Sequence, residues 1–189
     1  MAKKIFIDGR SYDGDLKDGK MNGFGTLTDP HGNVYKGEFR DDAMYGQGIK
    51  KSAQGGIYEG NFENGQINGN GLYTAPEGWT YEGEFKDGKI DGNGKRTFPD
   101  SKIIDEGDFK DAKLNGYGKR TFPDGSIYEG QWVNDKFHGQ GRLINAGSWT
   151  YMGEFKEGKL NGFGTKTYPD GSREEGEWLN NARVIRELE

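Results

Sequence analysis

The sequence predicts an all-β fold in which tandem β-hairpins form an elongated, single-layer antiparallel meander. Three observations predict it: a repeat of 23 residues, an alternation of aromatic and charged residues within each repeat, and short connections rich in glycine and proline. The seventh repeat is the last complete one, and the eighth stops early. A Y-x-G motif or its remnant opens the repeats at Tyr12, Tyr35, Tyr58, Tyr81, Asp105, Tyr128, Tyr151 and Glu174.

The first strand of each repeat begins at this opening residue, numbered here as position 0. Position 2 is glycine in every repeat, and position 4 is aromatic except at Leu16. Because alternate residues of a strand share a face, Tyr81, Gly83 and Phe85 are expected on one face and the glutamates between them on the other. Glycine inside a strand needs a packing reason, and we expect an aromatic ring to lie over it.

The second strand and the turns carry the remaining glycines and prolines. Positions 11 and 13 are glycine in every complete repeat, which provides a hollow for rings from adjacent hairpins. Glycine at position 7 indicates a tight hairpin turn. Ala112 stands at that position in the fifth repeat, where a different turn is expected. One extra residue before Asp105 predicts a bulge or a lengthened loop. Short connections make sequential strands adjacent and antiparallel.

Three regions are expected along the chain. Residues 1–11 form an N-terminal capping strand and partial repeat, residues 12–173 form seven repeats, and residues 174–189 form a partial eighth repeat with a cap or short helix. Asn180 or Asn181 is expected to begin that helix, which presents Val184, Ile185 and Leu188 on one face. The helix would either cover the last strand edge or reach a partner.

Composition excludes several classes of protein. The chain has no cysteine, so disulfides and thiolate metal sites are excluded, and no apolar run is long enough to span a bilayer. Its start carries two lysines without an apolar stretch, which is unlike a secretory signal and favours a cytoplasmic location. The net charge of -5 disfavours nucleic acid as a partner.

The residues that could support catalysis are scattered. His31 and His138 are separated by more than four repeats, and the aspartates of the P-D-G loops are explained by turn formation. The G-x-G pairs lack the strand-to-helix context of a phosphate loop. We therefore expect no catalytic residues, no metal site and no cofactor, and the sequence is not that of an enzyme.

The repeat resembles the MORN (membrane occupation and recognition nexus) repeat. The resemblance rests on Y-x-G-x-F/W, then G-x-G, then P-D-G, and covers about Gly9 to Trp178. It implies a twisted antiparallel sheet with a trough-like cross-section. Such arrays occur in junctional membrane proteins, lipid kinases, radial-spoke heads and cytoskeletal scaffolds, which makes a cytoskeletal or ciliary assembly the expected setting.

Three functions remain open. The first is a non-catalytic scaffold or adaptor that binds a helix or extended segment of a protein partner along the aromatic, glycine-lined trough. The second is a membrane tether that binds phosphoinositides through a basic stripe of Lys95, Arg96, Lys119 and Arg120. The third is the regulatory subunit of a separate enzyme. Open strand edges also predict a homodimer through the array ends. The expected trough residues are Tyr58, Phe62, Tyr81, Phe85, Phe109, Tyr128, Trp132, Tyr151, Phe155 and Trp178.

Overall fold

The fold is all-β, as the sequence predicts. The structure, a computed structural model, describes residues 2–185, which contain seventeen strands and no helix. The chain divides into two compact units, Met1–Gly92 and Asn93–Glu189. The boundary falls inside strand β9 (Lys89–Phe98).

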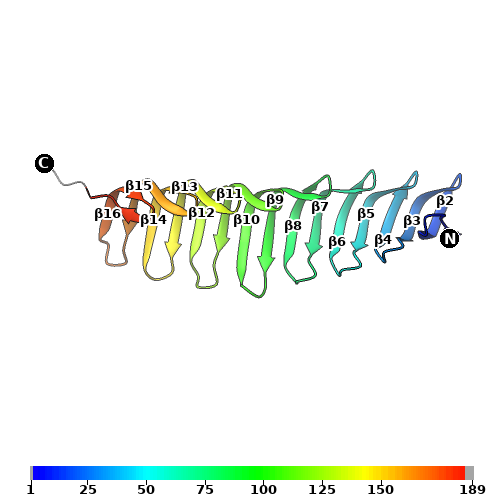
Figure 1. The fold of residues 1–189 in the computed structure, drawn as a ribbon, viewed down its shortest axis with the longest axis horizontal. Helices are drawn as coiled ribbons and strands as arrows, with labels where there is room; N and C mark the ends of the chain where they lie inside the picture. Colours follow the sequence, from blue (N-terminus) through cyan, green and yellow to red (C-terminus); the bar gives the residue numbers. More distant parts are fainter. Residues whose placement is uncertain (1, 186–189) are drawn as a thin grey trace. The chain divides into compact units, whose positions relative to one another are not determined.

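The first unit is a meander in which each strand pairs antiparallel with the strand before and after it, from β1 to β8 (Figure 1). Each hairpin therefore consists of an even-numbered first strand and the odd-numbered strand that follows it. The strands are β1 (Ala2–Ile5), β2 (Ser11–Lys17), β3 (Lys20–Thr28), β4 (Val34–Arg40), β5 (Ala43–Lys51), β6 (Ile57–Glu63), β7 (Gln66–Thr74) and β8 (Thr80–Lys86).

The second unit repeats this arrangement, with successive antiparallel pairs from β10 to β17. Its last strand is much shorter than the others. The strands are β10 (Ile103–Lys110), β11 (Lys113–Thr121), β12 (Ile127–Val133), β13 (Lys136–Asn145), β14 (Trp149–Lys156), β15 (Lys159–Thr167), β16 (Arg173–Leu179) and β17 (Ala182–Arg183).

The opening tyrosine packs over the glycines of its own hairpin. In the second repeat Gly37 and Gly48 lie opposite each other, and a Cβ atom added to Gly48 would meet the Tyr35 ring at 2.5 Å. The Tyr35 hydroxyl donates a hydrogen bond to the backbone oxygen of Glu38 at 2.9 Å. The predicted ring-over-glycine packing is confirmed, and it explains why these positions carry no side chain.

Aromatic contacts then join neighbouring repeats within each unit. The Tyr35 ring meets Phe39 of its own strand at 5.0 Å and Phe62 of the following repeat at 4.8 Å, both edge to face. Such T-shaped pairs add to the stabilisation from apolar burial. The core is thus a row of rings on one face of the sheet, called here the tyrosine face, which carries positions 0, 2 and 4.

The expectation of a different fifth turn was wrong. Asp111 and Ala112 have φ angles of 47° and 62°, so this turn has two positive φ angles like the others, for example Asp87 and Gly88 at 49° and 80°. A turn with both central φ angles positive matches the twist of the flanking strands, and that requirement prevails over the local preference of alanine. The loop before Asp105 is also not longer than its neighbours, because β9 and β10 extend to take up the additional residue.

The expected C-terminal helix is absent from the described residues. Asn180 and Asn181 form a hairpin turn with φ angles of 50° and 72°, and β17 follows directly and pairs with Trp178 and Leu179. The Asn181 side chain accepts a hydrogen bond from the backbone N–H of Leu160 at 2.8 Å. Its amide oxygen is thereby used in the turn instead of capping a helix. Leu188, the third residue of the expected helical face, lies outside the described residues.

Candidate functional site

The rings expected to line a binding trough are buried instead. Each of the ten is at most 6% exposed, because tyrosines such as Tyr58 lie over glycines of their own hairpin and rings of neighbouring repeats meet edge to face, as Tyr58 and Phe85 do. They form the core and offer no surface to a partner, so the anchors expected from the sequence are corrected. The residues are Tyr58, Phe62, Tyr81, Phe85, Phe109, Tyr128, Trp132, Tyr151, Phe155 and Trp178.

Burial also fixes the protonation of the core tyrosines. It raises the pKa of Tyr35, Tyr58 and Tyr151 to about 12, against backbone hydrogen bonds that lower it. The pKa of Tyr128 is raised for the same reason. These phenols are therefore neutral at physiological pH and serve as hydrogen-bond donors to backbone carbonyls.

The fifth repeat replaces the opening tyrosine with a buried ion-pair network. Asp105 is fully buried, and its carboxylate accepts hydrogen bonds from Arg96 Nη2 at 2.7 Å and Arg120 Nε at 2.6 Å. Each arginine adds a second bond to the same carboxylate, at 3.1 and 3.0 Å. Arg96 and Arg120 come from the strands on either side of Asp105, so the acid lies between two bases.

A second carboxylate and an aromatic ring complete this network. Asp135 accepts a hydrogen bond from Arg96 Nη2 at 3.0 Å and another from the backbone N–H of Leu114 at 2.9 Å. The Arg120 guanidinium lies 5.0 Å from the Trp132 ring centre. Two positive and two negative groups balance, which satisfies the requirement that buried charges be paired.

The four basic residues expected to contact phosphoinositides are split between two faces. Arg96 and Arg120 belong to the tyrosine face, and their guanidinium groups bind Asp105. Lys95 lies on the opposite face, where it pairs with Glu106 at 3.2 Å, and Lys119 stands opposite Glu106 in the sheet. The four do not form one basic surface.

The sequence did contain a signal for the network. In the sheet, the residue at position 15 pairs with position 0 of its own repeat on one side and with position 0 of the next repeat on the other. Asp105 is an acid at position 0, and Arg96 and Arg120 are the bases at position 15 on its two sides. Pairing these three residues required the strand register, which the repeat motif alone does not give.

An accessible aromatic surface lies in the second unit. A hollow of about 690 Å³ opens on the tyrosine face beyond the end of β11, and is called here the Phe122 hollow. Phe137 lines it, with its ring stacked on Tyr128 at 3.8 Å between ring centres and 6.3 Å from the Phe122 ring. The other complete repeats carry Met, Ile or Leu where Phe137 stands. The hollow is lined by Phe122, Pro123, Asp124, Ser126, Phe137, Leu143 and Asn145.

A carboxylate stands at the rim of this hollow. Asp124 is exposed and accepts hydrogen bonds from the backbone N–H and the hydroxyl of Ser126, at 2.9 and 3.0 Å. These bonds lower the pKa of Asp124, led by the backbone bond. The hollow thus combines half-buried aromatic rings with a fixed negative charge.

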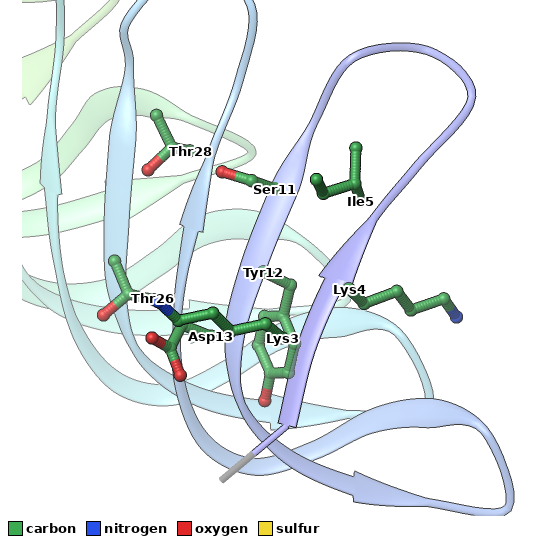
Figure 2. A pocket seen from close by; sticks show the side chains of 8 residues that line it. All are labelled: Lys3, Lys4, Ile5, Ser11, Tyr12, Asp13, Thr26 and Thr28. Carbon is green, nitrogen blue, oxygen red and sulfur yellow. The ribbon is translucent and has the colours of Figure 1, made fainter.

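A smaller hollow of about 290 Å³ lies beside β1 in the first unit. Figure 2 shows Ile5, Ser11 and Thr28 along its upper part, with Lys3 reaching across β2 toward Asp13 and Lys4 pointing away from it. Strand β1 therefore presents one lysine on each face of the sheet.

Metal and membrane features are not found in the described part of the chain. Residues 2–185 contain no group of three or more His, Cys, Asp or Glu side chains placed to hold a metal ion. Among the same residues there is no helix of the length and apolar character needed to cross a bilayer.

Comparison with known proteins gives a family and a fold. A model of the MORN repeat matches seven segments that together cover most of the chain. A search of curated protein sequences gave no match. The seven segments are residues 12–34, 35–57, 58–80, 81–102, 106–127, 128–148 and 151–173.

Among solved structures, the chain is similar to the SAS-4 (dCPAP) TCP domain of Drosophila melanogaster, solved in complex with a proline-rich motif of Ana2 (dSTIL). The TM-score is 0.52 at 16% identity, over 94% of this chain and 89% of that one, which shows a shared fold. Virginiamycin B lyase from Staphylococcus aureus matches 96% of this chain and 71% of its own at 11% identity. Its TM-score of 0.21 carries no argument about this protein.

Proposed function

The chain belongs to the MORN repeat family, and we propose that it is a non-catalytic scaffold that binds an extended, proline-rich protein segment at the Phe122 hollow. The observation that carries this proposal is the contrast between the core rings and the rings of the hollow. The repeated rings are buried, whereas Phe122 and Phe137 remain half-buried beside an open apolar surface.

The chemistry of the hollow suits a polyproline II ligand. Proline-rich segments dock in grooves lined by aromatic side chains, and their preformed helix loses little conformational entropy on binding. Phe122 and Phe137 are nearly perpendicular, at 84°, so a ligand ring that lies flat on one of them meets the other edge-on. Leu143 and Pro123 complete the apolar lining.

The fold neighbour supports the class of ligand. The TCP domain was solved with a proline-rich motif bound, so a sheet of this kind is able to carry such a segment. Asp124 adds a chemical preference, because a fixed carboxylate at the rim favours a ligand with an arginine or lysine next to its prolines. The proposed partner is therefore a basic, proline-rich segment of another protein.

A phosphoinositide tether is less well supported. Arg96 and Arg120 would have to leave a buried carboxylate to reach a headgroup, and that would uncover the charge of Asp105. We also propose that the protein works in a cytoskeletal or ciliary assembly, because other MORN arrays occur there. Microscopy of the tagged protein in its native cell tests this, and a signal that avoids cytoskeletal structures would contradict it.

Binding is tested by fluorescence polarisation with proline-rich peptides that carry an arginine. The double variant Phe122→Asn with Phe137→Leu removes both rings. Each new residue is the one that the following repeat carries at the equivalent position, Asn145 and Leu160. We expect it to weaken binding at least about tenfold, as the loss of aromatic anchors does at other interfaces. Phe98→Asn, at the position equivalent to Phe122 one repeat earlier, is the matched control.

Three results would contradict the proposal. The first is that no such peptide binds saturably. The second is that Phe98→Asn loses as much peptide affinity as the double variant. The third is that the double variant binds the peptide with full affinity. Sedimentation with phosphoinositide vesicles distinguishes the tether, since only that function predicts salt-sensitive cosedimentation.

A further inference from the structure

The eighth hairpin has only part of its second strand in the described residues. Strand β16 is a full first strand, but β17 pairs with Trp178 and Leu179 at the turn, and one further backbone hydrogen bond follows, from Val184 to Glu177 at 2.8 Å. In the complete hairpins the second strand continues past the turn and also pairs with positions −1 to 2 of the first strand. Thr121, for example, pairs with Ile104 of its own hairpin and with Ile127 of the next repeat. Within residues 2–185, no second strand pairs with Arg173 to Gly176 on this side.

Strand β1 is the complementary half of a second strand. Its residues pair with β2 in the register that second strands use with the following repeat, with Lys4 opposite Tyr12 and Ala2 opposite Gly14. Ala2 to Ile5 thus correspond to positions 13 to 16. In the described residues β1 pairs with β2 along one edge. Along its other edge, Ala2 to Ile5 are in the register in which a second strand pairs with the first strand of its own hairpin.

The charges of these two half-filled edges match. In the register of a complete hairpin, Lys4 would stand opposite Glu174, and Lys3 opposite Glu175. Opposite charges at directly facing positions stabilise a strand pair, and like charges there destabilise it. At these two pairs of positions the edges carry opposite charge.

The fifth hairpin shows the same combination inside the chain. Its first strand opens with two acids, Asp105 and Glu106, and its second strand carries two bases opposite them, Lys119 and Arg120. Asp105 and Arg120 form an ion pair at 2.6 Å. Repeats five and eight are the two in which an acid replaces the opening tyrosine, and repeat eight lacks the two bases that β1 carries.

The alanine of β1 fits the same comparison. In a tyrosine-opened hairpin the glycine at position 13 is covered by the ring, so that a Cβ atom on Gly25 would lie 2.3 Å from Tyr12. In the acid-opened fifth hairpin the nearest atom to such a Cβ on Gly118 is 2.9 Å away, on the backbone. Ala2 opposite Gly176 would therefore meet no tyrosine ring, because Glu174 stands in its place.

We propose that β1 of one copy of this protein completes the eighth hairpin of another, with Ala2, Lys3, Lys4 and Ile5 opposite Gly176, Glu175, Glu174 and Arg173. The contact joins two different edges and is heterologous, so it leads to head-to-tail chains of copies and not to a closed symmetric dimer. The contact is four residues long, so the association is weak and weakens further in salt.

Charge reversal tests the polarity of this contact by sedimentation velocity over a range of concentrations. Lys3→Glu with Lys4→Glu, and separately Glu174→Lys with Glu175→Lys, should each weaken self-association about tenfold or more. An equimolar mixture of the two variants should restore it, because each reversed edge then finds an opposite one. A variant that had simply lost its fold would not be rescued by mixing.

Disulfide cross-linking tests the register, since the chain has no cysteine of its own. Facing residues of antiparallel strands are about 4.5–5.5 Å apart at Cα, within the range of a disulfide. Chains with Lys3→Cys should cross-link to chains with Glu175→Cys in preference to chains with Glu177→Cys, two residues out of register. A chain ending at Ile185 keeps the whole contact and should associate as the full chain does.

Any one of the following results would overturn the proposal. They are a monomer at every concentration and low salt, no rescue in the mixture, equal cross-linking at Glu175→Cys and Glu177→Cys, and loss of association in the chain ending at Ile185. Predominant disulfides between two Lys3→Cys chains would also overturn it, because they indicate a symmetric contact. Peptide binding at the Phe122 hollow is measured separately and does not depend on these outcomes.

Discussion

Replacing Asp105 with asparagine should destabilise the second unit far more than an ordinary polar substitution. The change keeps the shape of the side chain and removes its charge, which leaves the Arg96 and Arg120 guanidinium groups facing a neutral amide. Asp105 accepts four hydrogen bonds from them, at 2.6 to 3.1 Å, and is fully buried. Breaking a buried ion pair costs about 3–5 kcal/mol.

The lower end of that range applies here. Asp135 still neutralises part of the charge, 3.0 Å from Arg96 and 3.8 Å from Arg120, and the Arg120 side chain is 18% exposed. We expect a loss of about 3 kcal/mol in the free energy of unfolding, or a fall of about 6–12 °C in Tm for a chain of this size.

Thermal and urea unfolding followed by circular dichroism measure this loss. Asp100→Asn, on an exposed turn next to the same strand, is the control and should change stability by less than about 0.5 kcal/mol. Equal stabilities for the two variants would refute the reasoning. Replacing Arg96, Asp105 and Arg120 together by apolar residues should cost less than Asp105→Asn alone, since the one charge that then remains, on Asp135, is 33% exposed to solvent.

Three further predictions concern the repeat itself. Gly48→Ala should cost about 1–3 kcal/mol because its Cβ atom meets the Tyr35 ring, and Gly118→Ala should cost less; equal losses in thermal unfolding would contradict ring packing as the cause. Ala112→Gly should stabilise the protein by about 1 kcal/mol, because glycine adopts the positive φ of 62° without strain, and an unchanged Tm would argue against strain there. Folding raises the pKa of Tyr35 to about 12, so the stability that the neutral phenol contributes is present below pH 10 and is lost as pH rises toward 12. Tyr35→Phe should reduce this alkaline loss of stability, measured by urea unfolding at several pH values. An unaltered pH dependence would contradict this prediction.

Much of the fold follows from the repeat. The glycines at facing positions, the rings beside them and the short turns each have a local physical reason, and together they specify antiparallel hairpins. Ala112 and Asn181 were interpreted wrongly because their local preferences were considered without the strands on either side. The twist of those strands selects one turn, and every residue at that place adopts it.

The site was less predictable because burial depends on the packing of neighbouring repeats. The pattern identifies an aromatic face, but it does not say whether rings such as Tyr58 cover one another or remain open, and the structure shows that they cover one another. The substitutions that depart from the pattern were more informative. Asp105 lies at the centre of the ion-pair network, and Phe137, in a position of aliphatic residues, lines the accessible hollow.

The central claim, that accessible rings of the second unit and not the repeated core rings contact a partner, is tested most directly by NMR. A proline-rich peptide with an arginine is added to the labelled protein, and the residues whose resonances shift are mapped. The account predicts saturable shifts centred on Phe122, Phe137 and Leu143, with Tyr58 and Phe62 unaffected. Shifts centred on Tyr58 and Phe62, or none that saturate, would contradict it.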